Sequence, residues 1–114
     1  MFLFTKKKEN VLLDCNDPVI INRLGIEAEK SGDIDLAIKL YEKNITNRFE
    51  GSHPYNRLSI IYRNKKMFDE EKRVLLTAID VFKHDVNIDR SDREPKLAKF
   101  QKRLDSVNNL IKKS

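Results

Sequence analysis

The chain is poor in the residues that build disulfide frameworks, tight turns and structural zinc sites. Its 114 residues include one cysteine, three glycines, three prolines, two histidines and no tryptophan. A lone Cys15 cannot form a disulfide within the chain, and a structural zinc site needs about four ligands, usually Cys or His in close pairs. So few glycines and prolines favour long helices over a many-turned β-fold. We therefore expect an all-α protein without a metal site or other cofactor.

Long apolar runs are also missing. No segment approaches the ~20 apolar residues that span a bilayer. The apolar run Phe2-Leu3-Phe4 is short and precedes the lysines Lys6, Lys7 and Lys8, whereas a secretory signal has the reverse order and a longer apolar stretch. Together with the single cysteine, this pattern predicts a cytoplasmic protein that does not bind a membrane.

The sequence holds no recognisable catalytic motif. Cys15 stands in an unpatterned stretch without the histidine and acid that would activate it. None of the three glycines forms a phosphate-binding loop, and the acids at 33 and 35 lead into a helical pattern rather than a calcium loop. The acid pairs Glu27/Glu29 and Glu70/Glu71 are interpreted as solvated helix surface. We expect the chain not to be an enzyme.

Positive charge is concentrated at the C-terminal end. The net charge is +5. From residue 95 onward there are six Lys or Arg and one acid, while the first 94 residues hold 17 basic and 17 acidic side chains. The basic character of the chain therefore belongs to its last segment alone.

A 34-residue repeat runs through the middle of the chain. The tripeptide Asn22-Arg23-Leu24 recurs as Asn56-Arg57-Leu58. At the same offset apolar residues match along both halves of the unit, in the pairs Ile21/Tyr55, Ile26/Ile60, Ala28/Tyr62, Ile34/Phe68, Leu40/Val74, Tyr41/Leu75 and Ile45/Ile79. Within each half the apolar steps are three and four, which places them on one helical face. The repeat predicts two similar helical hairpins.

Capping residues delimit the predicted helices. Asp17-Pro18 and Ser52-His53-Pro54 suit helix starts, while Gly32 and Asp33 suit a helix end followed by a new cap. In the second unit Lys66 replaces the glycine, so its turn signal is weaker. We predict helices at about 18–31, 34–48, 52–66, 68–83 and 94–112, the last with the apolar stripe Leu97, Phe100, Leu104, Val107 and Ile111.

This helix–turn–helix unit resembles the tetratricopeptide repeat (TPR). The first unit matches the family pattern with Ile21, Leu24-Gly25, Ala28, Gly32, Ala37 and Tyr41; the second matches with Tyr55, Leu58-Ser59, Tyr62, Leu75 and Ala78. It departs where Glu71 replaces the small Ala37 and Lys66 replaces Gly32, and both units lack the family's closing proline. The resemblance implies an α-α superhelix of two hairpins with a C-terminal capping helix. The repeats cover 18–51 and 52–84, and the patterns of the flanking segments predict an N-terminal arm at 1–17, a loop at 85–93 and a basic amphipathic helix at 94–114.

A stacked helical array presents a concave face from the first helix of each unit. Positions beside the core stripe are expected to line it, namely Asn22, Ile26 and Glu29 in the first unit and His53, Asn56, Ile60 and Arg63 in the second. An asparagine can donate and accept at once, and the resemblance implies that Asn22 and Asn56 hold a peptide backbone. The predicted function is therefore non-catalytic binding of a protein or peptide. The family's lysine-rich clamp for a C-terminal carboxylate is not supported, because it spans three repeats.

Two other kinds of partner stay open. The basic helix offers Lys96, Lys99, Lys102 and Arg103 to the phosphates of a nucleic acid or to another acidic surface, although no aromatic residue there is free to stack on bases. Apolar surface left at the ends of a two-unit array could also pair with a second copy of the chain.

Overall fold

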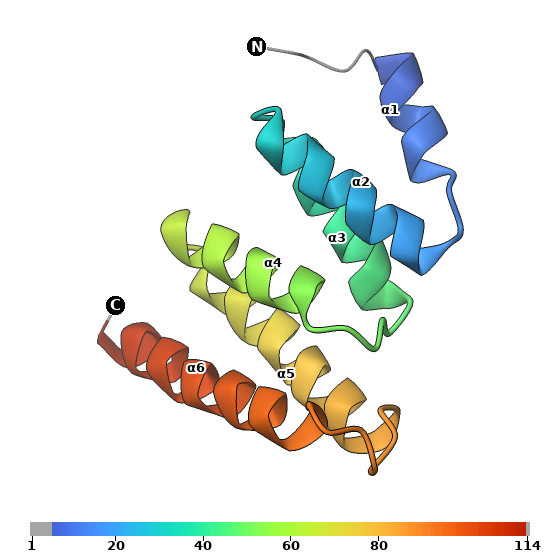
Figure 1. Ribbon diagram of the computed structural model, residues 1–114. Coiled ribbons are helices and arrows are strands. Elements are labelled where there is room, and N and C mark those ends of the chain that lie inside the picture. Colours follow the sequence, from blue (N-terminus) through green and yellow to red (C-terminus); the bar gives the residue numbers. More distant parts are fainter. Residues whose placement is uncertain (1–5, 114) are drawn as a thin grey trace. The chain divides into compact units, whose positions relative to one another are not determined.

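The computed structural model describes residues 6–113, and these residues form helices and connecting loops with no strand among them. The all-α prediction is confirmed. Within this described part six helices follow one another (Figure 1), with the bounds α1 Lys6–Leu13, α2 Pro18–Lys30, α3 Ile34–Thr46, α4 His53–Asn64, α5 Phe68–His84 and α6 Arg93–Lys113. They divide into unit 1, which ends at Asn47, and unit 2, which begins at Arg48.

Unit 1 is built on the α2–α3 hairpin, whose helix starts follow the sequence prediction. The Asp17 carboxylate accepts a hydrogen bond from the Val19 backbone amide at 3.0 Å, and the Asp33 carboxylate accepts one from the Leu36 amide at 3.1 Å. Gly32 lies between the helices with a φ of 84°. That left-handed conformation is cheap for glycine, so these caps and this turn are as expected.

The two helices of unit 1 approach closely at Gly25. A Cβ atom built there would lie 2.4 Å from the Cε1 atom of Tyr41, which is itself fully buried. The small residue therefore makes room for the tyrosine ring, whose hydroxyl donates to the Glu29 carboxylate at 2.8 Å. The remaining core side chains of the hairpin are apolar, namely Ile21, Ala28, Leu36, Ala37, Leu40 and Ile45.

Part of the predicted N-terminal arm is helical. Helix α1 contacts both α2 and α3. The Lys39 ammonium contacts the Glu9 carboxylate at 2.5 Å, and the Lys43 ammonium donates to the backbone carbonyls of Leu13 and Cys15, the latter at 2.6 Å. These polar contacts hold the arm on the hairpin. The apolar residues at positions 2–4 of the predicted arm lie outside the described residues.

Unit 2 begins with a hairpin of α4 and α5 that reproduces the turn of unit 1 without its glycine. Lys66 has a φ of 60°, and the Met67 amide donates to the Tyr62 carbonyl at 2.8 Å. In unit 1 the Asp33 amide donates to the Ala28 carbonyl at 2.9 Å. The two turns therefore end their helices in the same way, although only the first has the glycine that predicts it.

The predicted cap at Ser52 is wrong in its detail. Ser52 precedes α4, but its backbone is helical (φ −78°, ψ −20°) and its side chain makes no capping hydrogen bond. An N-cap side chain reaches the first-turn amides when its own backbone is extended. The entry to α4 is instead stabilised by the Tyr55 hydroxyl, which donates to the Phe49 carbonyl at 2.7 Å. Burial raises the pKa of Tyr55 well above its usual value, so it remains a donor.

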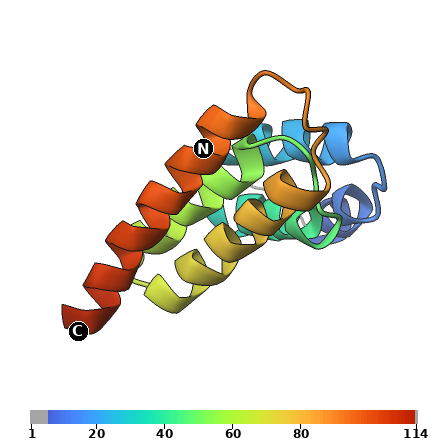
Figure 2. The ribbon, with the colours of Figure 1, turned by 90° about the horizontal axis from the view of Figure 1, so that it is seen from below.

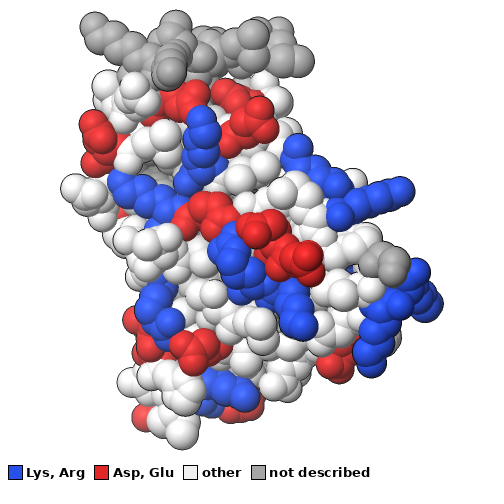
Figure 3. All heavy atoms as spheres, turned by 180° about the vertical axis from the view of Figure 1, so that it is seen from behind, with Lys and Arg blue, Asp and Glu red and all other residues white. Residues whose placement is uncertain are grey.

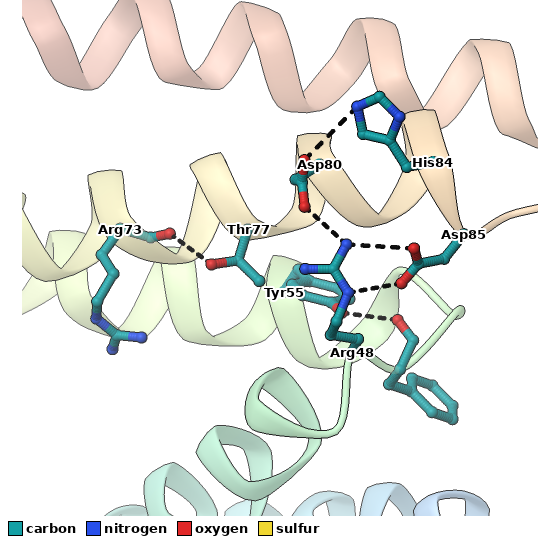
Figure 4. Close-up of polar contacts among 8 residues, drawn as sticks. Arg48, Tyr55, Arg73, Thr77, Asp80, His84 and Asp85 are labelled. Atoms are coloured by element: carbon teal, nitrogen blue, oxygen red, sulfur yellow. Dashed lines mark hydrogen bonds and ion pairs between the residues drawn. The ribbon is translucent and has the colours of Figure 1, made fainter.

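Arg48 connects the start of unit 2 to the end of α5 (Figure 4). Its guanidinium lies 2.7 Å from a carboxylate oxygen of Asp80 and 2.7 Å from one of Asp85. The hydrogen bond from Arg48 lowers the pKa of Asp85. His84 is also near, with its Nε2 atom 3.7 Å from Asp80. Arg48 follows α3 with a left-handed φ of 54°, as Gly32 follows α2 and Lys66 follows α4.

Helix α6 packs along α5 through the predicted apolar stripe (Figure 2). Phe100 is 1% exposed and lies edge-on to Phe82 and Tyr55, with ring centroids 5.2 Å and 6.1 Å away. Leu97 and Val107 are also buried. The preceding loop contributes the buried Val86, so α6 closes the apolar surface of the second hairpin as expected of a terminal helix.

Candidate functional site

The predicted binding residues of unit 1 lie along one face of α2. Asn22, Ile26 and Glu29 are all half-buried. The Oδ1 atom of Asn22 is buried and accepts no hydrogen bond from residues 6–113, whereas Glu29 accepts one from Tyr41. Glu29 therefore already has a partner within its own hairpin.

The predicted binding residues of unit 2 lie on α4, and they differ in how accessible they are. Asn56 is exposed, while His53, Ile60 and Arg63 are half-buried. The repeat-related asparagines are thus not equivalent, because Asn56 is exposed whereas Asn22 is half-buried and its Oδ1 atom is inaccessible. Asn56 is consequently the stronger candidate for holding a ligand.

A shallow cleft separates α4 from α6 in unit 2. Both helices pack on α5, and the larger part of the cleft has a volume of about 360 Å³. It is lined by Asn56, Arg63, Lys99, Lys102, Arg103 and Ser106. An adjoining pocket of about 50 Å³ shares Asn56 and Lys99 and adds Ser52, Lys96 and Phe100. We call these two connected hollows the α4–α6 trough. It combines residues that the sequence predicted for two different partners.

Glu71 pairs with both arginines of the trough, and the sequence interpretation of Glu71 is wrong. It was expected on a solvated helix face, yet its side chain is 0% exposed. Its carboxylate lies 2.9 Å from the Arg63 Nη2 atom and 3.0 Å from the Arg103 Nε atom. A buried carboxylate needs such partners, because removing a charge from water is costly. The neighbouring Glu70 is exposed and pairs with Arg73, as a surface acid would.

Arg63, on α4, also donates hydrogen bonds to two residues of α6. Its Nη1 atom donates to the Ser106 hydroxyl at 3.1 Å and its Nη2 atom to the Arg103 carbonyl at 3.4 Å. Burial, together with the nearby positive charge of Arg63, lowers the pKa of Arg103. Both arginines are therefore engaged in fixing α6 on the hairpin. Sequence reasoning missed this triad; the one signal was an acid, Glu71, at the position where the first repeat has Ala37.

The lysines of the trough differ from its arginines in their ion pairs. Lys96 lies 3.2 Å from Asp92, whereas Lys99 and Lys102 make no ion pair with residues 6–113. Both are exposed. Four cationic side chains line the larger hollow, and the two arginines among them share the carboxylate of Glu71. Two of these cations, the lysines, are available to a negatively charged ligand.

Charge is distributed unequally between the units. Up to Asn47 the sequence has seven Lys or Arg and eight acids, and from Arg48 onward it has sixteen and ten. The face drawn in Figure 3 carries interspersed acidic and basic side chains. The surplus of positive charge therefore belongs to unit 2, and two of its exposed lysines, Lys99 and Lys102, line the trough.

The described residues hold no cluster of potential metal ligands. No group of three or more His, Cys, Asp or Glu side chains lies close enough within residues 6–113 to hold a metal ion. Cys15 is a half-buried free thiol. Over the same residues, none of the helices has both the length and the apolar character needed to cross a membrane.

The comparisons with known proteins add no family. No protein-family model matches the chain, and neither a curated protein nor a solved structure is significantly similar to it. The TPR-like arrangement of the hairpins therefore stays a prediction from the repeat, and the functional argument depends on the trough itself.

Proposed function

We propose that this chain is a non-catalytic binding module that holds a segment of a partner protein in the α4–α6 trough. The observation that carries the proposal is the meeting of Asn56 with Lys99 and Lys102 across one hollow. An exposed asparagine can donate to and accept from a peptide backbone, and unpaired lysines favour acceptors on the ligand. Rigid helices position these groups, as a binding site requires.

The main alternative, nucleic acid, has less support. The basic charge of unit 2 favours any polyanion. Single-stranded nucleic acids, however, are held by stacking of bases on accessible aromatic rings, and no Phe or Tyr side chain in residues 6–113 is exposed. Helix α6 also uses Arg103 for an internal ion pair. Protein is therefore the favoured class of partner.

Self-association is supported least. The exposed large apolar side chains of the described part are scattered over three helices and two loops, namely Val11, Val19, Ile20, Met67, Leu76 and Ile88. Singly scattered apolar residues are normal on a protein surface. They do not by themselves define an interface with a second copy.

Selection of peptides from a random library against the full chain tests the proposal. Peptides that bind are expected to lose at least tenfold in affinity when Asn56 is replaced by alanine. Asn64→Ala is the matched control, because Asn64 is an exposed asparagine on the same helix outside the trough. If selection yields no binder, or if Asn56→Ala binds as wild type does, the proposed site is wrong.

A further inference from the structure

The dimensions of the trough limit what can occupy it. Along α4 it extends from Ser52 to Arg63, and along α6 from Lys96 to Ser106. At 1.5 Å per helical residue each wall is about 15–17 Å long. An extended chain advances about 3.3 Å per residue, so the trough accommodates roughly five residues of an extended segment.

The charged groups that line the trough indicate which kind of segment it would bind. Arg63 and Arg103 share Glu71, and Lys96 pairs with Asp92. The unpaired ammonium groups are therefore those of Lys99 and Lys102, three positions apart on α6. Residues at this spacing have Cβ atoms about 5–6 Å apart on the same helix face. Two anionic groups at a similar separation would match them.

An extended peptide presents such a pair when two acids are separated by one residue. Side chains two positions apart lie on the same side of an extended chain, about 6.5–7 Å from each other. Adjacent acids point to opposite sides. The lysine pair therefore matches the pattern acid–any residue–acid better than two consecutive acids.

We infer that the α4–α6 trough binds an extended acidic segment of a partner protein, about five residues long, with two side-chain carboxylates one residue apart. This inference rests on the proposed function and adds the class of ligand to it. Lys99 and Lys102 bind the two carboxylates, and Asn56 hydrogen-bonds the peptide backbone between them. The buried Glu71 limits the affinity, because it already neutralises part of the charge of the two arginines beneath the ligand.

Fluorescence anisotropy with short labelled peptides tests this assignment on the full chain. The probe is acetyl-Ala-Glu-Ala-Glu-Ala-amide. Its comparisons are the glutamine analogue, the isomer with adjacent glutamates, and the same peptide with a free terminal carboxylate. We expect the glutamine analogue to bind at least tenfold more weakly and the adjacent isomer several-fold more weakly, while the free carboxylate changes affinity less than threefold.

The contribution of the lysines is measured with paired variants. Lys99→Gln/Lys102→Gln is expected to lose at least tenfold in affinity for the probe. Lys112→Gln/Lys113→Gln removes the same charge from exposed positions of the same helix outside the trough and is expected to bind within about twofold of wild type. Equal loss in both variants would show that net charge alone drives binding and would overturn the inference.

The remaining outcomes separate this inference from the proposed function. If library peptides bind at Asn56 but glutamate and glutamine probes bind alike, the acidic specificity is wrong and the binding module stands. If a single-stranded oligonucleotide binds more tightly than every peptide and is lost in Lys99→Gln/Lys102→Gln, both are wrong. A tenfold gain in affinity from the free terminal carboxylate would show that the trough binds the C-terminus of a partner. That result would overturn the inference that it binds an internal segment.

Discussion

Gly32 and Lys66, thirty-four residues apart, adopt the same left-handed backbone conformation at equivalent turns, with φ angles of 84° and 60°. In both turns the next residue donates its amide to a carbonyl five positions earlier. The conformation costs a residue with a side chain about 1–2 kcal/mol and glycine almost nothing. The second hairpin therefore keeps the geometry of the repeat at an energetic cost.

This relationship predicts that Lys66→Gly stabilises the protein. We expect a gain of about 0.5–1 kcal/mol in the free energy of unfolding, since the strain relieved exceeds the greater chain entropy of glycine. Urea denaturation followed by circular dichroism measures it. Lys65→Gly is the control, because Lys65 has a right-handed φ of −85° and is expected to lose stability. A Lys66→Gly variant less stable than wild type would contradict the explanation.

Gly25→Ala is expected to destabilise unit 1. The added methyl group would overlap the Tyr41 ring, and overpacking of this kind costs about 1–3 kcal/mol. The second repeat has Ser59 and Leu75 at these positions, which suggests a compensating change. In a Tyr41→Leu background the same Gly25→Ala substitution should cost less. Equal costs in the two backgrounds would show that Tyr41 does not set the close approach.

Replacing Glu71 by glutamine tests the buried triad. The change leaves Arg63 and Arg103 without their shared carboxylate, and breaking a buried pair typically costs about 3–5 kcal/mol. We expect a loss at or below the lower end of this range, because both arginines retain some solvent contact. Glu70→Gln, one position away and exposed, should change stability by less than about 0.5 kcal/mol. Similar effects of the two substitutions would rule out the triad as a stabilising element.

The loop before α6 supplies a prediction about pH. Hydrogen bonds from Arg90, followed by those from Lys96, lower the pKa of Asp92 from its usual 3.8 to about 2. Because the pKa is lower in the folded state, the stabilisation is present above pH 4 and is lost as the pH falls from about 4 to about 2. Carboxyl-carbon NMR titration should show this value, and Arg90→Met should return it toward 3.8. An unchanged pKa in Arg90→Met would assign the shift to another group.

Most of the helical architecture follows from the sequence, because apolar steps of three and four and the caps at Asp17 and Asp33 are local signals. The left-handed Lys66 and the uncapped Ser52 depart from local preference, and tertiary packing decides both. Helix α1 was predicted only as part of an N-terminal arm, since its apolar pattern is brief and its polar contacts include Lys39 and Lys43, which lie about thirty residues further along the chain.

The candidate site was predictable only in pieces. Asn56 and Lys99 were each singled out, one by the repeat and the other by the charge at the C-terminal end. The two residues come together because α6 packs along α5. The spacing of residues in the sequence does not predict this packing, because a loop separates the two helices. The buried state of Glu71 was missed for the same reason, because its two arginine partners come from α4 and α6.

The most direct test of the trough is the position of amide shifts in a 1H–15N NMR titration of the full chain with acetyl-Ala-Glu-Ala-Glu-Ala-amide. We predict that the largest shifts fall on α4 around Asn56 and on α6 around Lys99 and Lys102, with little change at Lys112 and Lys113. Shifts concentrated at that C-terminal lysine pair, or on helices of unit 1, would contradict the assignment.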